Sequence, residues 1–531
     1  MSTMNTSYLY HSPKWGARRG LSLLLVLALS IAAKAQDTYL NERITNSSSD
    51  VIGTARYVGM GGALGALGAD MSVISWNPAG IGLYRKNDIA LTFGGTWGKS
   101  SIDEVNRGKG TFDQAGFVFN MKTGGETCPY INFAFNYQKK INFNHNFYAD
   151  NSDLGGLSQM DQVAGLTDYV TDNNTTLAGL AKDNDFFKAD GQYLYNEIRS
   201  SNNTYTHHSE GSLQSFDFNL STNVNNRAFL GLTVGVDNMR YSGWNSYWEF
   251  LNGEYNHDVY NDVRITGTGI NVKLGAIIRP IEDSPFRFGF AVETPTWYRL
   301  RNSTVMNLND LYRDGVESYL KFTLRSPWKV RASLGSTIGS SFAWDVDYEY
   351  AAYNKSSMGY PGNDDYYYGT IHDGYKDVAM NRHTRDNLRG THTLRVGLEA
   401  NATKNLSFRL GYNLSTSAYK KDISFDQLRI ADDGCTAMRD YATNTNYMRL
   451  GNTNIITLGM GYHYKKFYVD LAYKVRNQKA DFYAFDTSFT TNDPVYERNV
   501  ASMYDDLSQT IDPVNVDLTR HTITCTLGFK F

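Results

Sequence analysis

Apolar and polar residues alternate along most of the chain from residue 87 onward. In the segment 467–477 the apolar side chains fall on one face of an extended chain and the charged ones on the other, namely Val469, Leu471, Tyr473 and Val475 against Asp470, Lys474 and Arg476. A period of two indicates a β-strand with one apolar and one polar face. Fourteen segments follow this pattern, at about 87–98, 113–122, 130–148, 212–224, 227–240, 265–279, 286–299, 318–338, 341–351, 392–402, 405–417, 454–464, 467–477 and 520–531.

The connections between these segments alternate in length. Short links lie at 123–129, 225–226, 281–285, 339–340, 404 and 465–466, and long links at 99–112, 149–211, 241–264, 300–317, 352–391, 418–453 and 478–519. An even number of strands, with short turns at one rim and long loops at the other, is typical of bacterial outer-membrane barrels. A soluble β-sandwich gives no reason for such sorting. The pattern predicts an all-β protein with a 14-stranded antiparallel transmembrane β-barrel over residues 87–531.

The composition changes this picture little. The 531 residues are 41% apolar and 20% charged, and the mean hydropathy of -0.44 is too low for a helical membrane protein. Within a bilayer every backbone polar group must be paired, which a sheet achieves only by closing on itself with its apolar face toward lipid. The 38 Tyr and 8 Trp residues are available for interfacial girdles. With 51 Lys and Arg against 54 Asp and Glu, the chain lacks the basic excess of a nucleic-acid binder.

The first 35 residues have the organisation of a secretory signal peptide. Basic residues precede an apolar run from Leu21 to Ala33, and the run ends in the small-residue pattern Ala33-Lys34-Ala35. The alternative is a membrane anchor, but the apolar run is shorter than the roughly 20 residues that a spanning helix needs. We therefore predict cleavage after Ala35 and export to the bacterial outer membrane.

Residues 36–86 precede the first strand and are rich in glycine. Gly59 to Asp70 carries five glycines in twelve residues, and Trp76 to Leu83 is a turn-rich stretch. Such a segment suits a compact plug packed against other backbone. A phosphate-binding loop is disfavoured, because Leu64 stands where the third glycine of GxGxxG belongs and no Gly-Lys-Ser/Thr follows.

This glycine-rich run, followed by Asn77, Pro78, Ala79 and Gly80 just before the first strand, resembles the hatch of FadL-type outer-membrane transporters. The aromatic terminus, Phe531, also matches that family. The resemblance implies a monomeric barrel, plugged by its N-terminal hatch (36–86), that passes hydrophobic compounds such as long-chain fatty acids. In the family, the exit is a lateral gap near a kinked early strand, and the sequence between 130 and 147 does not show a kink.

Charged residues of two adjacent strands fall on the predicted lumen face. If Thr337 pairs with Ser341, the residues opposite each other are Arg331 and Asp347, and Lys329 and Glu349, with Asp345 on the same face. This charge ladder could bind a carboxylate head group or hold the hatch. The interpretation we favour is an ordinary polar lining, because charges facing a wet lumen are common in barrels.

The long connection 149–211 contains apolar residues at helical spacing, namely Leu157, Met160, Val163 and Leu166. Short amphipathic helices with an exposed apolar face could capture a hydrophobic ligand, since burial of each methylene contributes about 0.8 kcal/mol. Equally, the apolar faces of such helices could cover each other.

The sequence gives no support for a catalytic or metal site. The histidines do not show HxxxH or HExxH spacing, and no GxSxG motif is present. The three cysteines, Cys128, Cys435 and Cys525, are odd in number and are expected to be free thiols or to form at most one incidental bridge. We predict a non-enzymatic protein without cofactors.

The predicted function is therefore uptake of a hydrophobic small molecule across the outer membrane by passive, hatch-gated diffusion. The expected partners are that ligand and the lipid of the outer membrane, with no nucleic acid, and the barrel is expected to be a monomer. Two alternatives stay open: a general porin for polar solutes, and a FadL-like barrel that serves as a protein-binding scaffold for secreted cargo.

Overall fold

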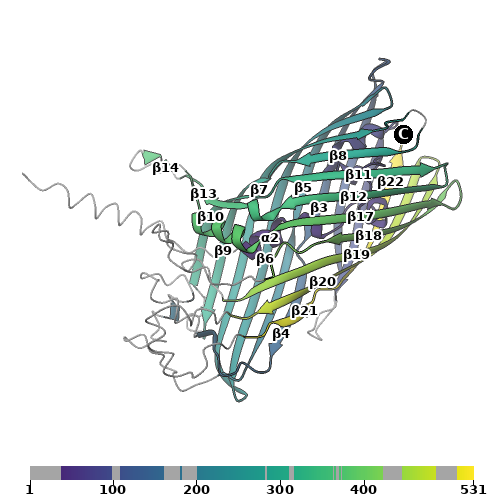
Figure 1. Cartoon of the computed structure of the whole chain (residues 1–531). Coiled ribbons are helices and arrows are strands. Elements are labelled where there is room, and N and C mark those ends of the chain that lie inside the picture. The colour runs from purple at the N-terminus through teal and green to yellow at the C-terminus, as the bar shows by residue number, and fades with distance from the viewer. Residues whose placement is uncertain are drawn as a thin grey trace, which may run out of the picture.

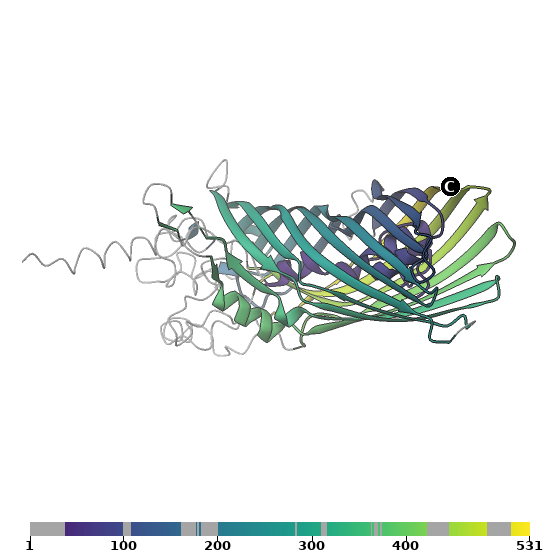
Figure 2. The ribbon, with the colours of Figure 1, turned by 90° about the horizontal axis from the view of Figure 1, so that it is seen from above.

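The protein is a closed antiparallel β-barrel of 14 wall strands, seen in the computed structural model of Figures 1 and 2. The structure describes residues 38–98, 108–160, 177, 180, 181, 200–281, 284–309, 316–362, 364–365, 370–371, 374–421, 445–485 and 511–531. The wall consists of β1 (Asp88–Gly98), β2 (Lys109–Lys122), β3 (Tyr130–Asn142) with β4 (His145–Asn151), β5 (Asn202–Val224), β6 (Ala228–Leu251), β7 (Glu254–Ile278), β8 (Arg287–Glu293) with β9 (Trp297–Leu308), β10 (Val316–Arg325) with β11 (Lys329–Ile338), β12 (Phe342–Ala352), β17 (Gly390–Asn401), β18 (Leu406–Ser415), β19 (Tyr447–Tyr464), β20 (Phe467–Tyr483), and β21 (Val514–Asp517) with β22 (Arg520–Lys530). The pairing of β1 with β22 closes the barrel. The predicted fold class is confirmed.

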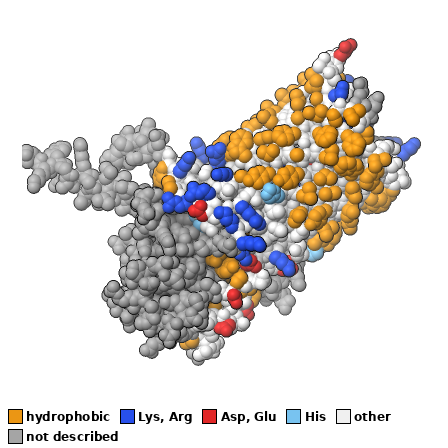
Figure 3. Space-filling model, viewed as in Figure 1, with side chains coloured by type: hydrophobic (Ala, Val, Ile, Leu, Met, Phe, Trp, Pro, Cys, Tyr) orange, Lys and Arg blue, Asp and Glu red, His pale blue; other side chains and the backbone are white. Residues whose placement is uncertain are grey.

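The two faces of the wall have the polarity expected in lipid. On β22, Thr522, Thr524 and Thr526 are buried in the interior, whereas Ile523 and Leu527 are about half exposed on the outside, at 49% and 48%. The same alternation gives a broad hydrophobic belt around the outer surface (Figure 3). Backbone groups are satisfied by the closed ladder, so that only apolar side chains need to face the hydrocarbon.

Three predicted strands prove to be interrupted. The segment predicted as one strand over 130–148 is divided at 143–144, and a register shift between Lys139 and Ile141 precedes the break. The breaks at 294–296 and 326–328 each contain a proline, Pro295 and Pro327, which lack the N–H that a ladder requires. These last two breaks lie side by side in neighbouring strands, since Glu293 pairs with Lys329 and Trp297 with Arg325.

The predicted long connection at 241–264 is wrong. Strands β6 and β7 instead continue through this region and pair from Ala228–Ile278 to Leu251–Glu254. They are joined by Asn252 and Gly253, both with positive φ (49° and 84°). Asn-Gly is the preferred sequence for a two-residue hairpin turn of this kind, so the wall extends beyond the hydrophobic belt at this point.

Smaller elements occupy the region predicted as the long connection 352–391. They are η4 (Tyr353–Lys355), β13 (Ser357–Tyr360), β14 (Asp364–Asp365), β15 (Thr370–Ile371), β16 (Tyr375–Lys376) and α6 (Val378–Asn387). Strand β13 pairs with β10, and thus carries the sheet on past the proline break of the neighbouring strand. No helix in the described ranges is long and apolar enough to cross a bilayer.

Residues 38–86, which we call the inner segment, lie within the barrel (Figure 2). The inner segment contains α2 (Thr38–Thr45), η1 (Ser47–Ser49), α3 (Ala55–Gly59), η2 (Met71–Ser75) and η3 (Pro78–Leu83). Its short helices begin at side-chain caps: Thr54 accepts a hydrogen bond from the Tyr57 N–H, and Asp70 accepts one from the Ser72 N–H. Its apolar side chains, from Val51 to Tyr84, pack into a small core together with wall residues such as Val118 and Ile455.

The backbones of the inner segment and the wall touch at facing glycines. A Cβ added to Gly411 on β18 would lie 2.0 Å from the nitrogen of Gly61, and one added to Gly59 would lie 3.0 Å from the Cα of Gly459 on β19. Gly61 also has a φ of +64°, which favours glycine. The glycine richness that predicted a packed plug is thus explained by close backbone approach.

Replacement of Gly411 by Ala should unseat the inner segment. The added methyl overlaps main-chain atoms that cannot rotate away, and overpacking of this kind costs about 1–3 kcal/mol. We expect faster hydrogen exchange in residues 55–64 of the purified protein. The matched control is Gly95→Ala on β1, where an added Cβ has nothing within 4 Å. Equal hydrogen exchange in both variants would contradict the close backbone contact between Gly411 and the inner segment.

Candidate functional site

The predicted charge ladder exists, but its register differs from the prediction by two residues. Ile338 pairs with Phe342 across a three-residue turn in which Gly339 has a φ of +56°, so Arg331 lies opposite Glu349 rather than Asp347. Lys329 lies opposite Ala351 rather than Glu349. The shift is an even number of residues, so every member of the ladder keeps its place on the interior face.

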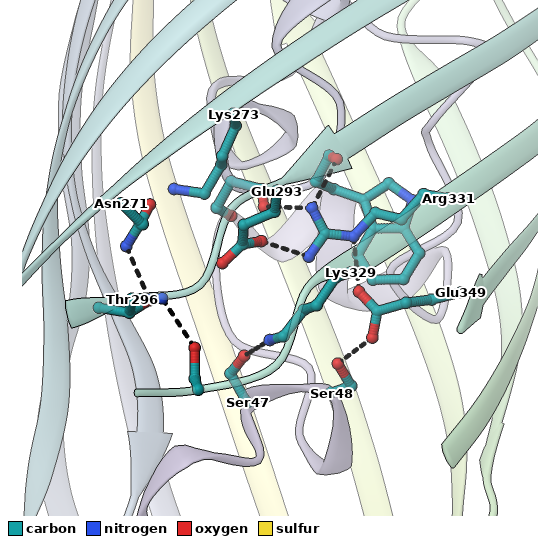
Figure 4. A network of polar contacts seen from close by, with 12 residues as sticks. Ser47, Ser48, Asn271, Lys273, Glu293, Thr296, Lys329, Arg331 and Glu349 are labelled. Carbon is teal, nitrogen blue, oxygen red and sulfur yellow. Dashed lines mark hydrogen bonds and ion pairs between the residues drawn. The ribbon is translucent and has the colours of Figure 1, made fainter. Parts of the chain in front are cut away.

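Arg331 is the centre of the ladder (Figure 4). Its guanidinium forms ion pairs of 2.6 Å with both Glu293 and Glu349, and the side chain is almost completely buried. The same group donates hydrogen bonds to the carbonyl oxygens of Ser75 (3.3 Å) and Trp76 (3.0 Å) in the inner segment. The guanidinium thus donates four hydrogen bonds, from all three of its nitrogens, and its planar, permanently charged shape suits this arrangement.

The three carboxylates of β12 also bind the inner segment. Asp347 accepts hydrogen bonds from the N–H groups of Leu64 and Gly65 (3.2 and 3.1 Å), and Asp345 accepts from those of Ala66 and Leu67 (3.0 and 2.8 Å). Glu349 accepts from the Ser48 hydroxyl, and Lys329 donates to the Ser47 hydroxyl at 2.8 Å. Every member of the predicted ladder therefore contacts the inner segment. The interpretation favoured from the sequence, an ordinary polar lining of a wet lumen, did not include these contacts.

The Asn-Pro-Ala-Gly motif is the point at which the inner segment meets β7, three strands from β12. Asn77 accepts a hydrogen bond from the Ala79 N–H (3.2 Å), and its amide donates to the Gly65 oxygen (2.8 Å) and to the Ala276 oxygen on β7 (3.4 Å). Pro78 begins η3, where its missing N–H is not needed. Asn77 thus connects two turns of the inner segment to each other and to β7.

Trp76, next to this motif, lies between two arginines of the wall. The guanidinium carbons of Arg395 and Arg331 are 3.6 and 4.6 Å from its ring centroid. Cation–π contacts of desolvated groups contribute up to about 2 kcal/mol each. These contacts hold the turn that precedes the motif.

Two further ionic anchors were missed by the sequence analysis. Asp50 of the inner segment pairs with Lys474 (2.6 Å) and Arg520, and Arg56 pairs with Glu399 on β17 (3.0 Å). Burial acts to raise the pKa of Asp50, but the positive charges of Arg520 and Lys474 outweigh it and hold the pKa below its usual range. The alternation places Lys474 on the polar face of its strand, but nothing in the sequence gives its partner, which lies more than 400 residues away.

A polar cavity lies where the inner segment faces the break between β3 and β4. Its volume is about 60 Å³, it is partly open to solvent, and its lining includes Arg43, Arg476, Arg520, Glu42 and Phe143. Arg520 pairs with Asp50, whereas Arg476 donates to the Ser49 oxygen and to Gln478, and Arg43 to Ser209. Burial raises the pKa of Glu42 despite hydrogen bonds from Asn46 and Tyr419. The cavity therefore has an excess of positive charge.

The interior beyond the inner segment, toward the long connections, contains a large apolar cluster together with buried polar groups such as Glu249. A large cluster of buried side chains spans it, including Tyr205, Ile265, Leu300, Phe322 and Phe482. Of the predicted capture residues, Met160 is buried at 2% exposure and Leu157 packs against the cluster. Neither contributes to an exposed groove. Val163 and Leu166 lie outside the described residues, so a ligand-capture loop stays a prediction.

Solved structures share this architecture, although no protein-family model and no curated protein matches the sequence significantly. A FadL homologue of Pseudomonas aeruginosa aligns at a TM-score of 0.52 with 12% identity, covering 90% of this chain and 98% of that chain. The chain has the FadL fold. The toluene transporters TbuX of Ralstonia pickettii (12% identity) and TodX of P. putida (11%) each align over 91% of this chain and 99% of theirs, with TM-scores of 0.45.

Within this FadL fold, the described residues contain no group of three His, Cys, Asp or Glu side chains that could hold a metal. Cys128 and Cys525 are free thiols, as predicted, and Cys525 is on the lipid-facing side of β22. Cys435 lies outside the described residues. The chemistry of the interior is thus hydrogen bonding and ion pairing.

Replacement of Arg331 by Met should loosen the inner segment more than any change on the outer face. The variant leaves Glu293 and Glu349 buried without their partner, and breaking a buried ion pair in this way costs roughly 3–5 kcal/mol. We expect greater protease sensitivity of residues 44–80 and a lower unfolding temperature. Arg301→Met, an exposed position on β9, is the matched control.

The triple change Arg331→Met, Glu293→Gln and Glu349→Gln removes the unpaired charges together and should recover part of the loss. If Arg331→Met behaved like the control, the ladder would not hold the inner segment.

Proposed function

We propose that this protein is an outer-membrane transporter for passive uptake of small hydrophobic molecules, with residues 36–86 acting as its hatch. The observation that carries the proposal is the division of the interior. The half near the short turns is filled by the inner segment on polar walls, and the half near the long connections is lined with buried apolar side chains. An apolar ligand would gain about 25 cal/mol for each Å² that it buries against such side chains.

A general porin fits this interior poorly. Polar solutes need a continuous aqueous lumen, whereas the inner segment occupies the barrel and is tied to the wall by charged anchors on β12, β17 and β20. Passage therefore requires the inner segment to shift, and a hatch is the simplest description of a segment that does so.

The ligand class we propose is an amphiphile with an acidic head, such as a long-chain fatty acid. Support comes from the cavity with Arg43, Arg476 and Arg520, because arginine pairs bidentately with carboxylates. The cavity borders the apolar cluster through Phe143. A carboxylate on the arginines and an alkyl chain among the apolar side chains would place both ends of one molecule in matching surroundings.

The route of exit we propose is lateral, at the break between β3 and β4. The ladder to β5 loses its regular register between Lys139 and Ile141, and residues 143–144 belong to neither strand. The arginine cavity lies directly inside this break. A ligand leaving there would enter the bilayer without crossing the inner segment completely.

A disulfide between the hatch and the wall should block uptake reversibly. Ala66→Cys with Gly335→Cys suits this test, because an added Cβ at Gly335 lies 3.2 Å from the Ala66 Cβ, close to the roughly 3.5–4.5 Å of native disulfides. We expect uptake of a labelled fatty acid into cells or proteoliposomes to fall at least tenfold on oxidation and to recover on reduction.

Each single cysteine variant, oxidised and reduced, serves as the control for damage by substitution. Unchanged uptake by the fully cross-linked protein would refute gating by the inner segment, while leaving the barrel fold untouched.

The acidic head can be tested separately by binding of oleate and its methyl ester to the purified protein. The double variant Arg43→Gln with Arg476→Gln should bind oleate about tenfold more weakly, since a hydrogen bond to a charged group contributes roughly 1.5–3 kcal/mol. Its affinity for the methyl ester should be unchanged. Lys404→Gln at the opposite rim is the control. If acid and ester bind equally to the unaltered protein, the ligand is hydrophobic but not acidic, and the transporter proposal survives.

A further inference from the structure

Basic side chains form a compact band on the outside of the barrel, just beyond the hydrophobic belt. We call it the outer basic band; all its members are exposed and point outward from four adjacent strands, namely Arg240 of β6, Arg264 of β7, Arg299 and Arg301 of β9, and Lys321 and Arg325 of β10. Figure 3 shows Lys and Arg side chains gathered along the edge of the hydrophobic surface.

The strand register places these residues in rows. One row runs directly across the four strands as Arg240, Thr266, Arg301 and Lys321. Arg299 lies one outward position closer to the belt than this row. Arg325 lies two outward positions closer to the belt, beside Trp297. The rows are thus about 7 Å apart along the strands, and all six cations belong to one patch.

The height of the band matches the surface of the membrane. On β7 the outward apolar positions extend from Ile278 to Ile270, which are eight residues apart and both at least half exposed. At about 3.3 Å per residue and a tilt of about 40°, they cover roughly 20 Å, most of the lipid-facing height of such a barrel. Trp297 pairs with Ile270 at the upper edge, where aromatic girdles lie, and the cations begin in this row with Arg325 and continue in the next.

Among the described residues, acids do not balance the positive charge of the band. Arg301 and Lys321 are direct cross-strand partners, and like charges in that relation destabilise a sheet. The described outward acids of these four strands, Asp258, Asp262 and Glu317, lie farther from the belt, and of the six band residues only Arg264 forms an ion pair with one of them, Asp262, at 3.2 Å. The unbalanced cations are therefore those nearest the lipid head groups.

We propose that the outer basic band binds the phosphate groups of an anionic glycolipid in the outer leaflet of the membrane. A flat patch of guanidinium groups is suited to bidentate contact with phosphate. Acyl chains of the same molecule would lie on the apolar surface around Ile270 and Leu274, which are 53% and 59% exposed. The band is on the outer surface, away from the interior cavity, so this proposal does not rest on the proposed transport function.

The test uses the full mature protein in a nonionic detergent, with diphosphorylated lipid A and the fully dephosphorylated lipid as probes. Native mass spectrometry counts bound lipid for the unaltered protein and for Arg299→Gln with Arg301→Gln and Lys321→Gln. The control carries the same number of changes at the short-turn rim, Lys122→Gln with Lys404→Gln and Lys466→Gln, all exposed. Heat-dependent gel mobility verifies that each variant is a folded barrel.

The unaltered protein and the control should bind the phosphorylated lipid in preference to the dephosphorylated one. The band variant should lose affinity for the phosphorylated lipid by about a hundredfold, since each basic residue near an anionic surface contributes about one factor of five. Equal binding of the two lipids, equal loss in the control, or no loss in the band variant would each overturn the proposal.

Discussion

The need to pair every backbone polar group in the absence of water governs the whole structure. Lipid offers no hydrogen bonds, so the sheet closes through β1 and β22 and turns its apolar residues outward. The polar residues are then left inside, where they are buried in turn. Lys273, for example, is buried completely and pairs with Asp217 at 2.8 Å. An interior of this kind needs partners, and the inner segment supplies many of them.

The inner segment matches the wall in two different ways. Glycines such as Gly61 and Gly411 allow main chain to meet main chain, while carboxylates and arginines of the wall take up the N–H and C=O groups that short turns leave unpaired. Asp345 and Asp347 accept four successive N–H groups from Leu64 to Leu67. Contacts of this type are strong only as long as water is excluded, so a small shift that admits water can weaken several of them together. The inner segment can therefore be held firmly by the wall and still be able to move.

The sequence predicted what depends on local periodicity. Strand number, the faces of the strands and the special position of residues 36–86 all follow from alternation and glycine content. Predictions failed where one or two residues decide the backbone: Asn252-Gly253 makes a tight hairpin of a supposed loop, and Pro327 divides a supposed continuous strand. The Arg331 register was wrong for the same reason, because the three-residue turn comprises residues 339–341 and not 338–340. Contacts such as Asp50 with Lys474 join distant parts of the chain and leave no local pattern.

The polarity of the barrel changes along its axis both inside and outside. Outside, the apolar belt is followed by a row of cations at the membrane surface and then by acids farther out. Inside, the polar walls around the inner segment give way to the apolar cluster, with the arginine cavity at their boundary. The cavity lies beside the break between β3 and β4, where the ladder to β5 is irregular in register. Three surroundings therefore meet at that point: the arginines that suit an acidic head, the apolar side chains that suit an alkyl chain, and the surrounding bilayer. A molecule with both properties needs no aqueous path from one to the next.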